Sequence, residues 1–453
     1  MSERLLSVGL DVGTTSTQMI LSELTVENRA GSFSVPQMEI AGRKILYKSD
    51  VHFTPLLSGD LVDAAALRKI VEADYRSAGI RREDVDTGAI IITGETSRKE
   101  NASAVLAELS GFAGEFVVTT AGPHLESVLA AKGAGAVDYT KRTGKTVLHM
   151  DIGGGTSNLA FIEDGKILHT GCLNVGGRLI KFDEKGIVIY VSPVLRELCA
   201  LRPGDRAERE QAEAVCGLLA EALEMAAGLR TPTELLDQLW TREAGSVWGA
   251  GSEADVISFS GGVADCIEKD VPWLTYGDMG PVLGQKIRNS RLCGKEYILG
   301  AETIRATVIG AGCHTTQLSG STIFCQNIAF PLKNIPVICL SRFEQKADVI
   351  RQRMEQQEGL AVLALPGFAA PGYEQVRHLA EVIAEGVGER TVLVCLEQDM
   401  AKALGQALAL RCGKDRPILC IDSVRLNEES FLDVGAPVGP ALPVVVKTLV
   451  LDR

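Results

Sequence analysis

The sequence predicts an α/β protein whose core consists of two similar lobes, followed by a smaller α/β unit. An apolar run, an aspartate, glycines and hydroxyl side chains follow one another in residues 7–17, and the same order returns in residues 148–157. Two such stretches about 140 residues apart indicate an internal duplication. The chain has 453 residues, more than one core usually encloses. After residue 316, apolar runs alternate with helical segments, which is typical of a parallel sheet.

The stretch at residues 148–157 carries the clearest chemical signal. Its apolar run reaches Asp151, and a turn of three glycines and a threonine follows. Glycine lets main-chain N–H groups close on a phosphate without a side chain in the way, and a carboxylate oxygen suits Mg²⁺ or its water shell. Taken alone, the motif also fits a strand that merely turns on glycines.

Two further stretches favour the phosphate site. Asp11 is followed by Gly13 and a cluster of hydroxyl side chains, and an apolar run returns at residues 18–21. A third apolar run, residues 256–260, ends in a pair of glycines against which a flat base or a ribose could lie. Together the three stretches indicate a nucleotide site built from both halves of the core.

Their order resembles that of the actin-like ATPase superfamily, which includes sugar kinases, actin and the seventy-kilodalton heat-shock chaperones. The resemblance implies a duplicated, ribonuclease H-like core that binds ATP and Mg²⁺. It also implies that Asp11 and Asp151 hold the metal, mostly through water, and take part in catalysis. The residues expected to cradle the β- and γ-phosphates are Gly13, Thr14, Thr15, Ser16, Gly153, Gly154, Gly155 and Thr156. Those expected to face the ribose and adenine are Gly176, Gly177, Gly261 and Gly262.

Two small-residue segments, 122–135 and 302–312, are expected to form the helices that connect the lobes. In the superfamily, the first of these helices carries an acidic or amide residue that positions the attacking water. Glu126 lies nine residues before Gly135, which is the spacing of the chaperone and actin branches, so we expect Glu126 to orient that water. An exposed helix glutamate is the alternative, and Glu95 is the reserve candidate.

Other charged positions near these motifs have no firm assignment. The lysine that some superfamily members direct at the γ-phosphate has no certain match, although Arg98 and Lys99 lie nearby in the sequence. Asp50 and His52 begin a pattern that resembles the cobalamin-ligand motif Asp-x-His-x-x-Gly, but Pro55 stands in place of the glycine. We therefore expect His52 to be a solvated loop residue.

The predicted domain boundaries follow from these motifs. The first lobe spans residues 1–145, with a strand-rich elaboration at 25–60, the second lobe spans 146–315, and the C-terminal α/β unit spans 316–453. No G-x-G-x-x-G pattern follows the apolar runs of the last unit. Near its end, residues 433–437 resemble the first aspartate motif without its hydroxyls and are expected to form a turn, whereas 443–451 should form a final strand.

Composition excludes several classes of protein. The formal charge of −12 argues against a sequence-independent nucleic-acid surface. No apolar run reaches about 18 residues and the N-terminus lacks the apolar core of a signal peptide, so we expect a cytoplasmic protein with no membrane partner. The eleven cysteines form no C-x-x-C pair, and we expect them to be reduced thiols.

A narrower resemblance extends over nearly the whole chain. Residues 6–21, the strand end at 92–96, the stretch 121–135 and the α/β unit behind an actin-like core resemble the ethanolamine ammonia-lyase reactivating factors. This family is chaperone-like: with ATP and Mg²⁺, it releases damaged cobalamin from the inactivated lyase so that intact adenosylcobalamin can bind. The resemblance implies the lyase and ATP or ADP as partners, an ATPase cycle, and a cytoplasmic protein for which association with a bacterial microcompartment stays open.

Three alternatives share the same phosphate turns. A small-molecule kinase needs an aspartate to accept a proton from its substrate, and none is evident between Ile90 and Thr120. A filament-forming relative of actin would self-associate in a nucleotide-dependent way. A core that has lost hydrolysis would serve as a scaffold for microcompartment enzymes.

Overall fold

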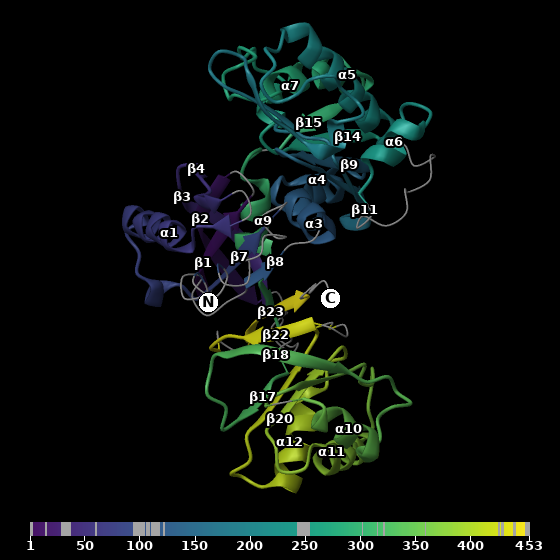
Figure 1. The fold of residues 1–453 in the computed structure, drawn as a ribbon. Coiled ribbons are helices and arrows are strands. Elements are labelled where there is room, and N and C mark those ends of the chain that lie inside the picture. The colour runs from purple at the N-terminus through teal and green to yellow at the C-terminus, as the bar shows by residue number, and fades with distance from the viewer. Residues whose placement is uncertain are drawn as a thin grey trace.

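The computed structural model describes residues 3–13, 16–28, 38–58, 61–93, 105, 109, 118–120, 123–241, 254–300, 302–314, 316–319, 322–357, 359–424, 426, 430–437 and 441–448. Figure 1 shows three bodies in a row, each built around a sheet. The sheet of the first half of the core lies in the middle, the sheet of the second half lies above it, and the C-terminal unit lies below.

The first sheet joins an antiparallel meander to two parallel strands. Its order is β3 (Met38–Lys48), β2 (Ser16–Asn28), β1 (Glu3–Val12), β7 (Thr87–Ile92) and β8 (Val118–Thr120). The first three strands pair antiparallel, whereas β1, β7 and β8 run parallel. Strand β4 (His52–Phe53) pairs with the start of β2, and β5 (Leu56–Ser58) pairs with β6 (Leu61–Val62). Helix α1 (Ala64–Ala78) is capped by the Asp63 carboxylate, which accepts the N–H of Ala66.

The second sheet repeats this arrangement strand by strand. Its order is β11 (Lys166–Leu173), β10 (Ser157–Glu163), β9 (Val147–Ile152), β14 (Val256–Ser260) and β15 (Tyr297–Leu299). Again the first three strands are antiparallel, and β9, β14 and β15 are parallel. Because two sheets of the same order and directions follow one another in one chain, the predicted duplicated fold is confirmed.

Apolar helices enclose the core of the second lobe. The helices are α5 (Arg209–Ala226), α6 (Glu234–Leu239), α7 (Gly280–Arg288) and α8 (Arg291–Gly294), and a small hairpin of β12 (Ile180–Phe182) and β13 (Val188–Val191) completes the layer. Their buried side chains form one continuous cluster with those of β9 and β10. This packing fixes the ends of the central strands, where the site lies.

Two helices exchange between the lobes and cross at the centre of the core (Figure 1). Helix α3 (Pro123–Gly133) follows the first sheet but packs on the second sheet beside α4 (Ala136–Thr143), and α9 (Ala306–His314) follows the second sheet but packs on the first. A Cβ at Gly310 would lie 2.0 Å from the carbonyl oxygen of Leu129, so the crossing requires glycine there. The second helix was expected to begin at residue 302; it begins at Ala306, because the carbonyls of Thr303 and Ile304 accept hydrogen bonds from Gly261 and Gln18 of other segments.

The C-terminal unit has an eight-stranded sheet whose middle is parallel, as expected. Strands β18 (Leu332–Cys339), β19 (Val362–Leu365), β20 (Val392–Leu396) and β21 (Ile418–Asp422) run parallel and are connected through α10 (Ala347–Glu355), α11 (Tyr373–Val387) and α12 (Ala401–Cys412). Antiparallel strands extend it at both ends: β22 (Ser430–Val434), β23 (Pro443–Thr448) and β16 (Thr316–Leu318) beside β18, and β17 (Phe324–Gln326) beside β21.

Strand β22 corrects one expectation from the sequence. Asp433 and Val434 were expected in a turn, but they belong to this buried strand, which pairs with β18 on one side and β23 on the other. The final strand was expected, and β23 confirms it within the described residues. All eleven cysteines are free thiols, as expected. None of the helices in the described ranges is long and apolar enough to cross a membrane.

Candidate functional site

The site is built on two equivalent hairpin turns, one in each lobe. In each, an aspartate lies one residue before the end of the central strand, and a four-residue turn leads into the next strand. The first residue of each turn donates its N–H to the carbonyl oxygen of the fourth: Gly13 to Ser16 and Gly153 to Thr156, both at 2.9 Å. The two predicted phosphate turns therefore close in the same way. Thr14 and Thr15 lie outside the described residues.

The two aspartates lie close enough for their charges to repel. Burial raises the pKa of Asp11 to about 7, and the nearby Asp151 charge adds to this rise, although a hydrogen bond from Thr93 at 2.9 Å opposes it. Burial likewise raises the pKa of Asp151 to about 6. Neither carboxylate forms an ion pair with any described residue. Two desolvated acids that share one place and lack a cation are what a divalent metal would neutralise.

Asp151 is held by a buried chain of hydrogen bonds. Ser260 donates to its Oδ1, and Thr307 donates to its Oδ2 at 3.4 Å. Behind Ser260 lies His149, whose Nε2 is 3.0 Å from the serine Oγ and whose Nδ1 is 3.0 Å from Ser258 Oγ. Burial lowers the pKa of His149 to about 3, so the ring is neutral. Because the Ser260 proton points at Asp151, Nε2 carries the imidazole hydrogen and Nδ1 accepts from Ser258.

Each aspartate also has a carboxamide directly across the hairpin. Gln18 pairs with Asp11, and Asn158 pairs with Asp151. The amide nitrogens are in use: Gln18 Nε2 donates to the carbonyl of Ile304 at 3.2 Å, and Asn158 Nδ2 donates to a Glu126 oxygen at 2.8 Å. Both partners are acceptors, which fixes the orientation of each amide.

The oxygens of these two amides have no partner among the described residues. Gln18 Oε1 and Asn158 Oδ1 are buried and accept no hydrogen bond from the part of the chain that is described. An orphaned buried acceptor costs about 1–3 kcal/mol. Two carboxylates and two unsatisfied amide oxygens gather hard oxygen atoms at one place, which fits a Mg²⁺ ion carrying its own waters. No cluster of three or more His, Cys, Asp or Glu side chains suited to a metal occurs in the described ranges, so water would have to complete the coordination.

Glu126 lies beside this site rather than on the surface. Its side chain is 7% exposed and accepts the hydrogen bond from Asn158. Because Asn158 faces Asp151 across the hairpin, Glu126 reaches the same face of the second sheet as the aspartate. The alternative of an exposed helix glutamate is therefore wrong, while the role in orienting water stays a prediction. Glu95, Arg98 and Lys99 lie outside the described residues.

The expected sugar-facing glycines fall into two groups. Gly176 and Gly261 pack against backbone: an added Cβ would lie 2.4 Å from the Gly154 oxygen and 2.3 Å from the Ile152 oxygen, respectively. Gly177 likewise donates its N–H to the carbonyl of Gly153 at 3.0 Å. These contacts explain the glycines without a ligand, whereas Gly262 has only Ile304 within 4 Å of its Cβ position. Among these four glycines, Gly262 thus has the least crowded Cβ position.

The N–H groups of Gly154 and Gly155 donate to no described residue, and a Cβ at Gly155 would meet nothing within 4 Å. Bare amides at the tip of an Asp-Gly turn suit phosphate oxygens.

His52 is not the solvated loop residue that the sequence predicts. It lies in β4, half-buried, with its Nε2 3.0 Å from Asp74 Oδ1.

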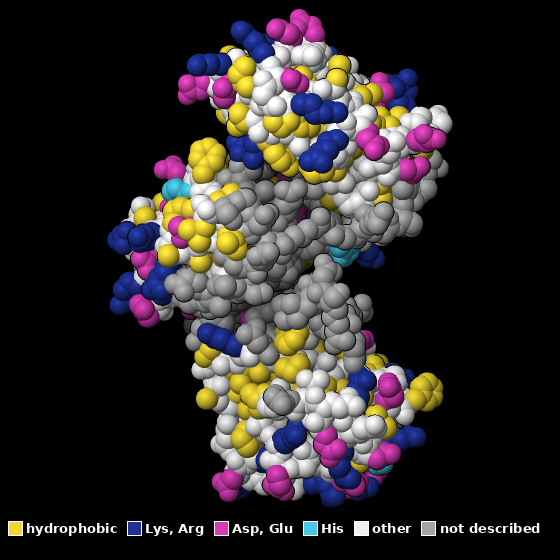
Figure 2. Space-filling view, in the orientation of Figure 1, with side chains coloured by type: hydrophobic (Ala, Val, Ile, Leu, Met, Phe, Trp, Pro, Cys, Tyr) yellow, Lys and Arg dark blue, Asp and Glu magenta, His cyan; other side chains and the backbone are white. Residues whose placement is uncertain are grey.

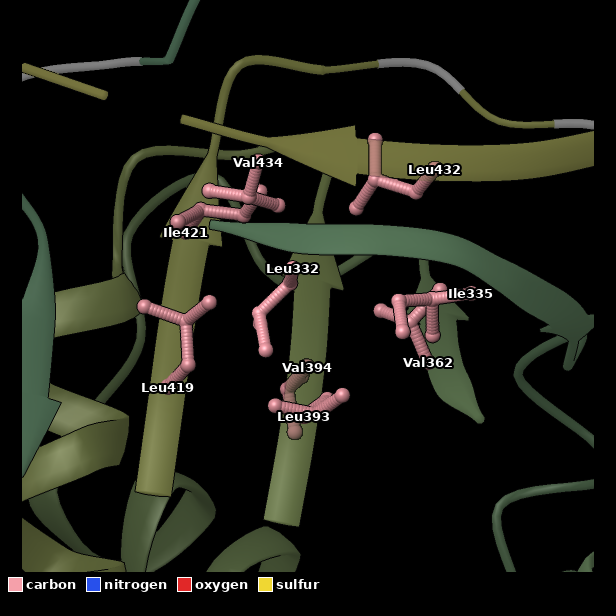
Figure 3. Close-up of a pocket in the computed structure, with 9 residues that line it drawn as sticks. All are labelled: Leu332, Ile335, Val362, Leu393, Val394, Leu419, Ile421, Leu432 and Val434. Carbon is pink, nitrogen blue, oxygen red and sulfur yellow. The ribbon is translucent and has the colours of Figure 1, made fainter. Parts of the chain in front are cut away.

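The C-terminal unit shows no comparable site in its described part. Its cavity, between β22 and the parallel strands, is lined only by aliphatic side chains (Figure 3): Leu332, Ile335, Val362, Leu393, Val394, Leu419, Ile421, Leu432 and Val434. The free volume is about 10 Å³, the lower limit for a single water molecule. The cavity is a packing gap within the core.

The sequence matches, over residues 3–452, the family described as "Ethanolamine utilisation protein EutA". The chain belongs to the EutA family. Within that family it is 37% identical to the ethanolamine ammonia-lyase reactivase EutA of Salmonella typhimurium and 36% identical to that of Escherichia coli K12, in each case over 99% of both chains. The predicted family is confirmed.

Solved structures of other families share less with this EutA-family chain. A Ppx/GppA phosphatase of Aquifex aeolicus is 13% identical, covering 68% of this chain and 99% of its own, with a TM-score of 0.39. The ethanolamine utilization protein EutJ of Carboxydothermus hydrogenoformans is 20% identical, covering 68% and 89%, with a TM-score of 0.34. At these TM-scores they add nothing to what the strand order establishes.

Proposed function

We propose that this protein reactivates ethanolamine ammonia-lyase and that Mg·ATP, bound between the turns at Asp11 and Asp151, drives the process. The relatives that match the chain from end to end carry the name of that activity. The observation that supports the nucleotide is the facing pair of aspartates, each at the end of a central strand and each followed by the same four-residue turn. The damaged cobalamin would leave the lyase, and intact adenosylcobalamin would replace it.

In this proposal Asp11 and Asp151 hold the metal through its waters, and Gln18 and Asn158 accept hydrogen bonds from those waters. A bound Mg²⁺ supplies positive charge to the phosphates as they part. The amides of Gly154 and Gly155 bind phosphate oxygens, and Ser260, backed by His149, keeps Asp151 in one orientation. The site therefore binds and orients, which is most of what phosphoryl transfer requires.

Glu126 would orient the water that attacks the terminal phosphate. Asn158 donates to one oxygen of the glutamate, which fixes the carboxylate and keeps it an acceptor for the water's proton. The role depends on α3, the helix that carries Glu126 from the first lobe onto the second sheet. Closure of the lobes would thus move this residue together with the helix crossing.

The same crossing provides a route from the nucleotide to the rest of the molecule. Val445 of β23 packs in one small apolar cluster with Leu129 of α3 and Ala311 of α9. A change in the angle between the two helices therefore displaces a strand of the C-terminal unit. Nucleotide-dependent motion of that unit against a bound lyase would open the lyase for cofactor exchange.

The experiment is recovery of activity by ethanolamine ammonia-lyase inactivated with cyanocobalamin. The inactive lyase is mixed with this protein, free adenosylcobalamin, and either Mg·ATP, ATP with EDTA, or no nucleotide. We expect recovery only with Mg·ATP. Recovery without nucleotide would contradict the role of ATP, and no recovery in any mixture would contradict reactivation itself. A parallel incubation with sugars and acids tests for phosphorylated products, which would indicate a kinase.

A further inference from the structure

Arg178 lies at the second phosphate turn and was not singled out as a ligand of the phosphates. It directly follows the Gly176-Gly177 pair, and its N–H donates to the carbonyl oxygen of Gly154 at 2.6 Å. Its side chain runs over that glycine, since a Cβ at Gly154 would lie 3.4 Å from Arg178 Cδ. The main chain thus fixes this arginine directly above the glycines that would bind phosphate.

The guanidinium is oriented but only partly used. Its Nε donates to Oδ2 of Asp278 at 2.9 Å, and Asp278, which is buried, also accepts the N–H of Gly280 at 2.8 Å. The two Nη groups of Arg178 donate to no residue that the structure describes. The side chain is 24% exposed, so water or a ligand can reach those groups. An arginine held at one edge with its fork free is arranged to bind an oxyanion.

The same guanidinium touches the other lobe. Its central carbon lies 5.8 Å from the ring centre of Phe53, which belongs to β4 of the first sheet. Phe53 pairs in the sheet with Ser16, the last residue of the first phosphate turn, and its ring is 74% exposed. Figure 1 shows β4 on the side of the first lobe that faces the second. Arg178 therefore bridges the second turn and the edge of the first.

We propose that Arg178 binds the terminal phosphate of a nucleoside triphosphate and that its contact with Phe53 makes closure of the lobes depend on that phosphate. This proposal rests on the nucleotide site of the proposed function. The two aspartates at the site carry negative charge, so a phosphate needs a protein cation as well as the metal, and this guanidinium stands over the turn. The nucleoside diphosphate lacks the group that Arg178 reaches. Arg178 is therefore a residue that distinguishes ATP from ADP.

The test compares Mg·ATP and Mg·ADP affinities by titration calorimetry in the full-length protein and in Arg178→Gln. We expect the affinity for Mg·ATP to fall by about 10–100-fold, which is what the loss of charge-assisted hydrogen bonds predicts. The affinity for Mg·ADP should change by less than about threefold, which is the size of change that the loss of a solvent-accessible ion pair typically produces. The control is Arg209→Gln, which removes another arginine of the second lobe, one paired with Glu213. It should change neither affinity.

Two further variants keep the test decisive. Arg178→Lys preserves a charge for Asp278 but loses the fork, so it should lose part of the preference for ATP even if Arg178→Gln does not fold. We expect ATP to decrease the radius of gyration of the unaltered protein in solution scattering. Phe53→Leu should bind ATP with unchanged affinity but should not show this decrease. An unchanged ratio of the two affinities in both Arg178 variants would overturn the inference alone. Failure of the unaltered protein to bind either nucleotide would instead overturn the proposed function.

Discussion

The hydrogen bonds that the described residues make at the two aspartate turns differ between the lobes. Asp151 accepts from Ser260 and Thr307, and the carbonyls of Gly153 and Gly154 pair with the following segment of the second lobe. Asp11 accepts from Thr93 alone among described residues. The turn beside Asp11 is tied down by a Thr54 hydroxyl, which donates to the carbonyl of Gly13 at 2.7 Å.

This difference indicates how two copies of one hairpin divide their work. We propose that the second lobe binds the nucleotide first, because the described partners of Asp151 and of the turn that follows it lie within that lobe or on the connecting helix α9. Asp11 of the first lobe would then close on the same ion.

The largest expected effects come from substitution of the two aspartates. Asp151→Asn and Asp11→Asn should each remove measurable binding of Mg·ATP, because in the proposed site both lobes share one ion and each amide would remove a charge that faces it. Calorimetry at neutral pH checks this. The control is Asp164→Asn in the exposed β10–β11 turn, where a φ of 46° suits asparagine. Normal affinity in Asp11→Asn would show that the first turn takes no part.

Substitution of Glu126 should have the next largest effect. Glu126→Gln should bind Mg·ATP with nearly unchanged affinity, because the amide oxygen can still accept from Asn158, while hydrolysis slows by about 10²–10⁴-fold. Phosphate release under single-turnover conditions measures it, with the exposed Glu163→Gln as control. Undiminished turnover would transfer the role to Glu95 or another residue.

The helix crossing that joins the two halves is tested at Gly310. A Cβ there would meet the Leu129 carbonyl at 2.0 Å, so Gly310→Ala should lower the free energy of unfolding by about 3 kcal/mol or separate the helices. Gly217→Ala, in α5 with nothing within 4 Å of the new Cβ, should instead raise it by up to about 1 kcal/mol. Denaturant titration compares the two. Equal effects would mean that the crossing is not tightly packed.

The smallest expected effects come from removal of the hydroxyl groups that donate hydrogen bonds to the two aspartates. Ser260→Ala leaves a buried imidazole N–H of His149 without an acceptor, so it should lower the free energy of unfolding by about 1–3 kcal/mol. Thr93→Ala removes one hydroxyl donor to Asp11 and should lower the free energy of unfolding by less than about 1 kcal/mol. Thermal unfolding ranks the variants. A larger loss in Thr93→Ala would mean that the donor to Asp11 contributes more to stability than the donor to Asp151.

The duplicated fold could be predicted because its signal is local. Each Asp-Gly turn is a short stretch whose chemistry dictates a hairpin, and its recurrence implies a repeated sheet. The placement of Glu126 also followed from spacing along one helix. Strand β22 was missed because its short apolar stretch is a strand only through pairing, and one of its two partners, β18, lies about a hundred residues earlier in the sequence.

The partners of the site were missed for the same reason. His149 bonds to serines more than a hundred residues away, and Arg178 acts through Asp278 and Phe53 on other segments. One local signal was present: Ser258 and Ser260 alternate in an otherwise apolar strand, so both point to one face, where buried hydroxyls need partners. The Gln18 and Asn158 amides required the register of the hairpins.

The most direct test of the shared site is the position of a metal ion in crystals grown with Mn²⁺ and a non-hydrolysable ATP analogue. We expect an anomalous-scattering peak between the carboxylates of Asp11 and Asp151, with the phosphates against Gly154 and Gly155. A nucleotide with its metal bound elsewhere, for example on the C-terminal unit, would contradict it.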